Sequence, residues 1–231
     1  MLKGRRFFGA GLFFAVLTLF CAPLQAALVN SYEFDGDLSD SLGNGADLVA
    51  NGGIINAGRY DFQNNEGLTL SPALSDTTTY SIEIRYLQND NFGRYRKLID
   101  YQSLSADFGL YTLDNQPVFF GLGGSGTDFV PADTDVTLLI SRDGATNILD
   151  VRLNGVLQFS HLDDGSLGVS AVNEINFFVD DTISSQTESF TGSVDYIRIY
   201  DTAVVPVPAA FPLLLSALAM GGFFARSTRT P

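Results

Sequence analysis

The chain has 231 residues, 45% of them hydrophobic, and a formal net charge of −13. This length accommodates one domain or two small ones, and the hydrophobic content excludes an intrinsically disordered chain. The acidic balance excludes a basic nucleic-acid-binding protein, and the single Cys excludes a disulfide framework and a cysteine-based zinc site.

The charges are unevenly distributed along the chain. Residues 1–26 contain three basic residues and no acid, and residues 207–231 contain two basic residues and no acid. All 26 acidic residues therefore lie in the middle segment with the remaining eight basic residues, which gives that segment a charge of −18. Two apolar ends with basic margins around an acidic middle are typical of an exported, processed protein.

Residues 1–26 have the three parts of a secretory signal peptide. Met1–Arg6 is basic, Phe7–Ala22 is apolar, and Pro23 interrupts the expected signal helix. Leu24–Ala26 then places a small residue before the cleavage point, as signal peptidase requires. We therefore expect export and cleavage after residue 26, with an uncleaved membrane anchor as the alternative.

Residues 27–204 contain short apolar or alternating runs of the length of β-strands. No window has a sustained helical period, so we expect few helices and about twelve strands. The predicted strands are Leu28–Phe34, Arg59–Phe62, Gly67–Leu70, Tyr80–Leu87, Lys97–Tyr101, Phe108–Leu113, Val118–Leu122, Val136–Arg142, Ile148–Leu153, Val156–Leu162, Glu174–Val179 and Ser193–Tyr200.

The alternation and the turns indicate antiparallel pairing. In Tyr80–Tyr86 the two Tyr and two Ile residues share one face, and Val194–Tyr200 separates its faces similarly. Asp143–Gly144 and Asn154–Gly155 are typical of tight hairpin turns with positive φ angles. The sequence therefore predicts one all-β domain, an antiparallel two-sheet sandwich over residues 27–204.

Three segments resemble laminin G-like, concanavalin A-like jelly-roll domains. The opening Tyr32–Gly36 and Asp40–Gly45 resemble the first part of that family. Arg142–Gly144 with Val151–Val156 resembles its central hairpin, and Phe190–Tyr200 resembles its closing strand. The resemblance covers almost the whole middle segment and implies a jelly-roll fold in a family that includes binding modules and glucanases.

The residues needed for hydrolysis are not evident in the sequence. Glycoside hydrolysis needs two carboxylates about 5–10 Å apart, and the Glu-x-Asp-x-x-Glu pattern of the glucanase members is missing. Asp180 and Asp181 are adjacent and would point to opposite faces of a regular strand. The chain has a single histidine, His161, and no Gly-x-Ser-x-Gly motif that would supply a nucleophilic serine for a triad. It also lacks Trp, a usual platform for sugar rings in cleaving clefts. We therefore expect no enzymatic activity.

Calcium is the one cofactor that the sequence suggests. The laminin G-like resemblance implies a Ca²⁺ where the opening segment meets the closing strands. It carries that role onto Asp35 and Asp195, and less directly onto Asp40. Carboxylate oxygens are suitable ligands for this ion. The alternative is that Asp35 and Asp40 form turns by accepting bonds from their own backbone.

The segment Asn89–Lys97 combines basic and aromatic side chains. Its candidate ligand-binding residues are Phe92, Arg94, Tyr95 and Arg96. Arginine and tyrosine together can contact anionic sugars through hydrogen bonds and ring packing. The alternative is a solvated hairpin tip.

The C-terminal tail, residues 205–231, has three parts in order. A Pro-containing stretch precedes the apolar run Phe211–Ala225, and Arg226 and Arg229 follow it. The stretch consists of Val205, Pro206, Val207, Pro208, Ala209 and Ala210. The simpler interpretation is a C-terminal membrane-spanning helix used as an anchor, although about 15 apolar residues are short for a bilayer core of about 30 Å.

This tail also resembles the PEP-CTERM sorting signal of Gram-negative bacteria, although Val207 stands where that family often has Glu. The resemblance implies recognition by an exosortase-type membrane protease, with transient insertion in the inner membrane. We therefore expect a non-enzymatic surface or extracellular-matrix protein whose partner is a polysaccharide or a surface protein. The alternatives are a membrane-anchored carbohydrate-binding module and a divergent glycosidase.

Overall fold

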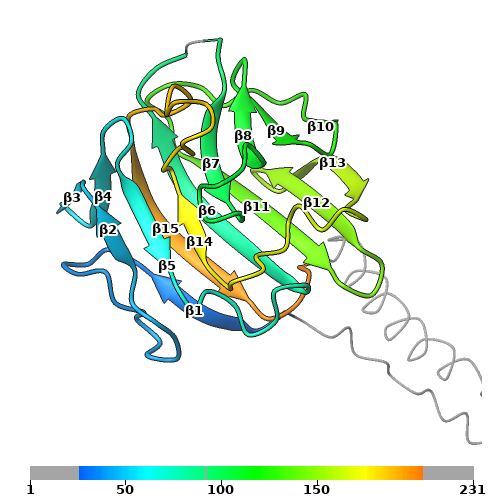
Figure 1. Ribbon diagram of the computed structural model, residues 1–231. Coiled ribbons are helices and arrows are strands. Elements are labelled where there is room, and N and C mark those ends of the chain that lie inside the picture. The colour runs from blue at the N-terminus through cyan, green and yellow to red at the C-terminus, as the bar shows by residue number, and fades with distance from the viewer. Residues whose placement is uncertain (1–25, 92, 205–231) are drawn as a thin grey trace, which may run out of the picture.

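The computed structural model describes residues 26–204 apart from Phe92. These residues form 15 strands in two antiparallel sheets, and no helix occurs among them (Figure 1). The expected all-β class and two-sheet sandwich are therefore confirmed. The expected signal peptide apart from Ala26, the expected sorting tail and Phe92 lie outside the described residues. Within the described part, no helix is long and apolar enough to cross a membrane.

Sheet A contains eight strands in the order β13-β12-β11-β6-β15-β4-β3, and β1 also pairs with β15. The strand β15 is long enough for β4 to pair with its first part and β1 with its last. The strands are β1 Leu28–Tyr32, β3 Ile54–Asn56, β4 Arg59–Phe62, β6 Tyr80–Gln88, β11 Val136–Asp143, β12 Ile148–Leu153, β13 Val156–Leu162 and β15 Gly192–Tyr200.

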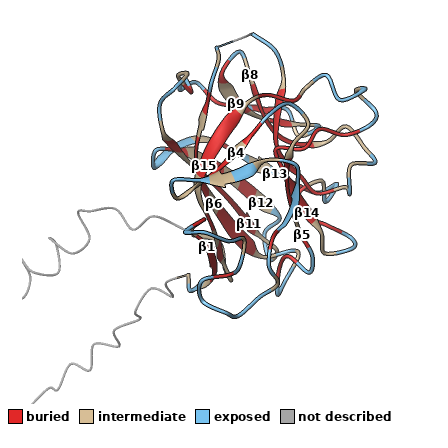
Figure 2. Ribbon diagram, turned by 90° about the vertical axis from the view of Figure 1, so that its left-hand side faces the viewer, coloured by how far each residue is buried: buried red, intermediate tan, exposed pale blue. Residues whose placement is uncertain are grey.

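Sheet B contains seven strands in the order β10-β9-β8-β7-β14-β5-β2. It covers the core-facing side of sheet A, and the buried residues lie between the two layers (Figure 2). Its strands are β2 Val49–Asn51, β5 Gly67–Leu70, β7 Arg96–Asp100, β8 Gly109–Leu113, β9 Gln116–Phe120, β10 Gly124–Ser125 and β14 Ile175–Phe177.

Each of the twelve predicted runs overlaps an observed strand, and three short strands were missed. The missed strands β2 and β3 have three residues each, and β10 has two. Asn154 and Gly155 have φ angles of 49° and 81°, which confirms the predicted tight hairpin. The turn after β11 differs from the prediction, because its positive φ lies at Asn147 rather than at Gly144.

The core consists of residues that alternate along the strands. On β6, Tyr80, Ile82, Ile84 and Tyr86 are each no more than 1% exposed, which confirms the face predicted for them. Aromatic rings join the sheets across the core. Phe62 of β4 stacks on Phe178 with ring centroids 4.6 Å apart. Burial of such large rings supplies the main driving force for sheet packing.

The first and last residues of the sandwich lie side by side. Leu28 pairs with Tyr200 in the ladder between β1 and β15. Beyond the ladder, the Ala27 amide donates to Asp201 Oδ1 at 3.0 Å. Segments that precede and follow the domain therefore start at the same end of sheet A.

A buried ion pair attaches the loop after β13 to β11. The Arg142 guanidinium is 1% exposed and donates from Nε to Asp163 Oδ2 at 2.8 Å. Its Nη1 donates to the Thr78 carbonyl at 2.7 Å, and Nη2 donates to Asn147 Oδ1 at 3.0 Å. The Asp163 carboxylate in turn accepts the backbone amides of Leu167 and Gly168. Because every charge is hydrogen-bonded, the pair is tolerated inside the fold.

We expect Arg142→Met to lower the free energy of unfolding by about 3–5 kcal/mol, because it leaves Asp163 buried without its partner. Urea unfolding of the full chain, followed by circular dichroism, measures this change. The matched control is Arg85→Met, because Arg85 is 45% exposed in its ion pairs with Asp135 and Asp195. That exposed change should cost less than about 1 kcal/mol. Equal losses in both variants would contradict the structural role of the buried pair.

Candidate functional site

Four aromatic rings gather on the outer face of sheet B. We call Tyr95, Phe108, Tyr111 and Phe120 the aromatic face. Tyr95 contacts Tyr111 and Phe120 edge-on, with centroids 5.7 and 5.6 Å apart. Phe108 stacks on Phe120 at 6.4 Å. Tyr95, Phe108 and Phe120 are half-buried, so their rings keep surface that faces solvent.

Strand alternation places this cluster outside the core. On β8, Leu110 belongs to the core between the sheets, whereas the next residue, Tyr111, does not. Side chains of successive strand residues point to opposite faces, so Tyr111 faces outward. Its direct neighbour in the ladder with β7 is Lys97. The Lys97 ammonium lies 4.9 Å from the centroid of the Tyr111 ring.

A long connection between β14 and β15 folds back over sheet B beside these rings. We call residues 178–191 the strap. Phe178 and Phe190, near its two ends, are fully buried in the core. The Phe178 amide donates to the Leu98 carbonyl at 3.1 Å, and the Lys97 amide donates to the Glu188 carbonyl at 2.9 Å. The strap is therefore attached to β7 at both ends.

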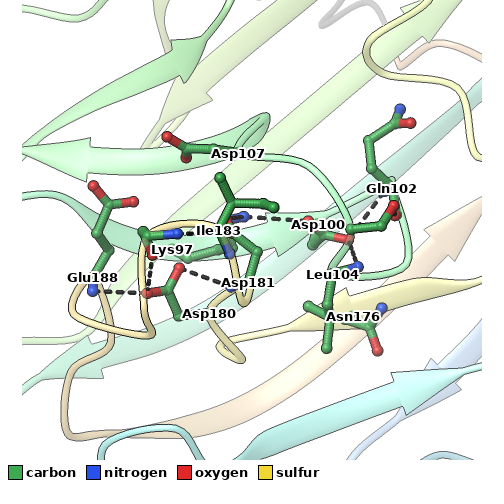
Figure 3. A network of polar contacts seen from close by, with 12 residues as sticks. Lys97, Asp100, Gln102, Leu104, Asp107, Asn176, Asp180, Asp181, Ile183 and Glu188 are labelled. Carbon is green, nitrogen blue, oxygen red and sulfur yellow. Dashed lines mark hydrogen bonds and ion pairs between the residues drawn. The ribbon is translucent and has the colours of Figure 1, made fainter.

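Lys97 is the charged centre of this attachment. Its side chain is 0% exposed, and its ammonium donates to Asp100 Oδ2 at 3.2 Å and to Asp181 Oδ2. Asp100 and Asp181 are also 0% exposed. Figure 3 shows Lys97 and Asp181 side by side, with Asp180 and Glu188 next to them and Asp107 approaching from the loop before β8. An ammonium with no solvent contact needs these carboxylates, because an unpaired buried charge is strongly destabilising.

The two adjacent aspartates organise the strap itself. Asp180 Oδ2 accepts the Glu188 amide at 2.7 Å and the Ser184 hydroxyl at 2.8 Å. Asp181 Oδ1 accepts the amides of Ile183 and Ser184 at 2.8 and 2.9 Å. Burial would raise the pKa of Asp181, but hydrogen bonds from Lys97 and the strap amides hold it below its usual value. Asp181 is therefore ionised at neutral pH.

Three carboxylates converge at the junction of strap and sheet. One oxygen from each of Asp107, Asp181 and Glu188 lies within 4.8 Å of the others, and this is the one such acidic group found among the described residues. Burial, together with the charges of Asp107, Asp180 and Asp181, raises the pKa of Glu188 to about 7. Its Oε2 atom is buried and accepts no hydrogen bond.

The group is better suited to sharing a proton than to holding a metal ion. Both oxygens of Asp181 already accept hydrogen bonds, from Lys97 and from two amides. Asp107 Oδ1 accepts the Tyr111 hydroxyl at 2.8 Å. The arrangement thus leaves few free oxygen lone pairs for a cation that needs six to eight ligands.

The structure places the predicted calcium residues in separate roles. Asp40 accepts five N–H donors, among them the amides of Ser31 and Asn44 at 2.8 Å each. Asp195, on the bulge of β15, pairs with Arg59 at 3.7 Å and Arg85 at 3.2 Å. Asp35, Asp40 and Asp195 do not form a converging acidic group within the described part of the chain. Calcium binding by these residues stays a prediction.

The structure also places the predicted ligand-binding residues in different surroundings. Tyr95 belongs to the aromatic face and Arg94 is exposed beside it in sequence. Arg96 is 0% exposed, pairs with Asp90 and donates to Asn115 Oδ1 at 2.9 Å, so it holds the loop from inside. Tyr95 is thus joined by ring contacts to other candidate site residues.

Sequence reasoning missed most of this site. Asp107, Asp181 and Glu188 come from two loops that are far apart in the chain, and no local pattern connects them. Asp180 and Asp181 were considered on a regular strand, but they follow β14 in the strap and both are fully buried. The one available signal was the adjacent pair itself, because two neighbouring buried acids require specific partners.

Comparison with protein-family models finds no match, and neither does comparison with curated proteins. Similar folds are found among solved structures. Domain 4 of AbnA, a GH43 extracellular arabinanase from Geobacillus stearothermophilus solved with arabinotriose, is 21% identical with a TM-score of 0.61. The match covers 79% of this chain and 96% of that domain.

Two larger proteins share the fold over part of their length. The binding domain of botulinum neurotoxin serotype D is 12% identical with a TM-score of 0.56, and 49% of it is covered. Trypanosoma rangeli sialidase, in complex with 2,3-difluorosialic acid, is 9% identical with a TM-score of 0.60, and 31% of it is covered. Each match covers 77% of this chain. At these identities the likeness establishes the β-sandwich fold.

The calcium prediction can be tested on the full chain. If Asp35, Asp40 and Asp195 hold Ca²⁺, excess EDTA should lower the melting temperature, because removing a ligand bound to the folded state removes its stabilisation. An unchanged melting temperature would mean that Asp40 and Asp195 serve only the contacts they make within the protein. Differential scanning fluorimetry in EDTA, with and without added Ca²⁺, measures this. A melting temperature that falls in EDTA, recovers with Ca²⁺ and no longer responds in Asp195→Ala would establish the predicted calcium site.

Proposed function

We propose that this chain is an exported, non-catalytic protein whose sandwich binds carbohydrate at the aromatic face. The observation that carries the proposal is the set of half-buried rings outside sheet B, next to a row of carboxylates. Monomeric proteins seldom expose a contiguous apolar patch unless that patch contacts a partner.

The chemistry of this face suits a sugar. The C–H faces of pyranose and furanose rings pack on aromatic rings, and carboxylates accept hydrogen bonds from sugar hydroxyls. Phe120 and Tyr95 offer the rings, and Asp107 offers a carboxylate beside them. The charge of −18 in the middle segment favours neutral sugars over anionic ones.

The comparisons support this proposal at the level of fold. One similar domain, 96% of which is covered by the match, was solved with arabinotriose. The laminin G-like resemblance of the sequence points to the same class of binding domain.

We expect the full chain to bind neutral oligosaccharides on a glycan array that includes arabinotriose. Tyr95→Ala and Phe120→Ala should each weaken binding about fivefold, because one ring contact contributes about 1 kcal/mol. The chain should be purified in a detergent without a sugar headgroup, because a glycosidic detergent would compete. The matched control is Phe129→Ala, which removes a ring that is 52% exposed but lies outside the aromatic face.

Binding that survives in both face variants would place the site elsewhere. Failure to bind any glycan would refute the proposed function.

We also propose that the C-terminal tail sorts the protein to the cell surface or the extracellular matrix of a Gram-negative bacterium. The residues that support this are the Pro-containing stretch 205–210, the apolar run after it and the terminal Arg residues. Proline fixes φ near −65° and disfavours helix in the residue before it, so a protease can read this stretch as an extended segment. The tail would then connect to the sandwich at the end of sheet A where the first and last residues of the domain lie side by side.

We expect the surface protein to lack about 25 C-terminal residues, a length set by the position of the motif in the sequence. Changing Pro206 and Pro208 to Ala together should leave the tail attached and the protein in the inner membrane. Intact-mass measurement of the surface fraction tests both expectations. A mature wild-type protein that retains residues 211–231 would show that the tail is a plain anchor.

A second candidate function is a divergent glycosidase, and one observation favours it. Glu188 has a pKa raised to about 7 and lies beside two other carboxylates, as a general acid would. A reducing-sugar assay on the glycans that bind tests this. Turnover by the wild type that Glu188→Gln abolishes would establish an enzyme.

A further inference from the structure

The strap is held against sheet B by charges that do not balance. Asp100, Asp107, Asp180, Asp181 and Glu188 contribute five carboxyl groups around it. Lys97, from β7, is the cation that bonds to this group among the described residues. Its ammonium is already engaged by Asp100 and Asp181, so it bonds to neither Asp107 nor Glu188.

Geometry therefore makes Glu188 the group that responds to protons. Carboxylates within 4.8 Å of each other repel strongly when all are ionised in a partly buried site. Asp181 is fixed as an anion by Lys97 and by strap amides, and Asp107 accepts the Tyr111 hydroxyl. Glu188 Oε2 has no donor at all, so protonation relieves repulsion most there.

The position of Glu188 connects this repulsion to the strap. Its amide donates to Asp180, and its carbonyl accepts the Lys97 amide, so its backbone joins the strap to β7. Tyr111 belongs to the aromatic face, and its hydroxyl bonds to Asp107 and approaches Asp181 at 3.4 Å. A change in the acidic group therefore reaches the aromatic face through Tyr111.

We propose that Glu188 is a proton-operated latch, which closes the strap on sheet B when protonated and loosens it when ionised. The latch regulates the site of the proposed function, and to that extent the inference rests on that function. The groups that face Glu188 are Lys97 of β7, Tyr111 of β8, Asp107 of the loop before β8, and Asp180 and Asp181 of the strap.

The direction in which pH shifts the strap between its closed and open forms follows from the pKa of Glu188 in each form. The pKa of Glu188 is about 7 in the closed form, compared with 4.5 for a solvated glutamate. The closed strap therefore binds more protons than the open strap between these values. The population of the open strap rises as pH increases through this range and levels off above neutrality.

Hydrogen–deuterium exchange of the full chain tests the latch without any ligand. Protection factors, corrected for the intrinsic pH dependence of exchange, are measured for residues 178–191 from pH 5 to pH 8. We expect them to fall roughly fiftyfold between pH 5 and pH 7.5, as the two pKa values imply, while protection in β11 stays constant. Strap protection that does not change with pH would overturn the proposal.

Variants assign the response to the carboxyl group. Glu188→Gln should remove the pH dependence and keep the strap protected at pH 8. Asp107→Asn, which removes one repelling charge, should weaken the dependence while Glu188 remains, and it serves if Glu188→Gln does not fold. Glu174→Gln, just before β14 and outside the acidic group, is the matched control and should behave like the wild type. An unchanged pH profile in both Glu188→Gln and Asp107→Asn would overturn the latch.

Arabinotriose titrated at pH 6 and pH 8 then tests the link to binding. A difference in affinity between the two pH values that Glu188→Gln removes would support the latch as a regulator of the site. Equal affinity at both pH values, with pH-dependent exchange, would overturn regulation while leaving the latch. Absence of arabinotriose and array binding, with pH-dependent exchange, would count against the proposed function alone.

Discussion

The buried ammonium of Lys97 is the interaction on which the outer face of sheet B depends. A lysine with no exposed surface is unstable unless anions surround it. Asp100 comes from the same strand, but Asp181 reaches Lys97 only because the strap folds back over the sheet. The need to pair one buried charge therefore helps to hold the strap against the sheet, together with the buried rings of Phe178 and Phe190 near its ends.

That constraint has consequences for every group near it. Once Asp181 is fixed, Glu188 and Asp107 are brought within 4.8 Å, and their charges have no cation of their own. The same loop lies beside Tyr111, whose ring contacts Tyr95 and Phe120. A rigid sandwich thus carries, on one face, a surface suited to a sugar and an acidic group that responds to pH. Rigid sheets that position variable loops are a common way of building binding sites.

The fold was largely predictable from the sequence, and the site was not. Strand alternation in Tyr80–Tyr86 is a local property, so it identified both the strand and its buried face correctly. The missed strands β2 and β3 are short and mostly exposed, so they leave no apolar alternation to detect. The Asp143–Gly144 turn was placed too early because Asn147 also tolerates a positive φ.

The acidic group depends on contacts that only the tertiary fold provides. Lys97 and Asp181 are 84 residues apart in sequence, and nothing local indicates that they pair. Arg96 is a residue for which the local sequence suggested a role that the tertiary fold does not support. Next to Tyr95 in a polar loop it resembled a ligand contact, yet strand β7 turns it into the interior, where it bonds to Asn115. Tyr95 precedes the strand and is half-buried, whereas Arg96 is the first residue of β7 and is fully buried.

The central claim is that carbohydrate binds on the outer face of sheet B, beside the strap. Hydrogen–deuterium exchange of the full chain, with and without a saturating oligosaccharide from the glycan array, tests it most directly. The account predicts added protection in residues 93–97, in β8 and β9, and in the strap, with the outer face of sheet A unchanged. Protection confined to sheet A, or to the loop that contains Asp35 and Asp40, would contradict it.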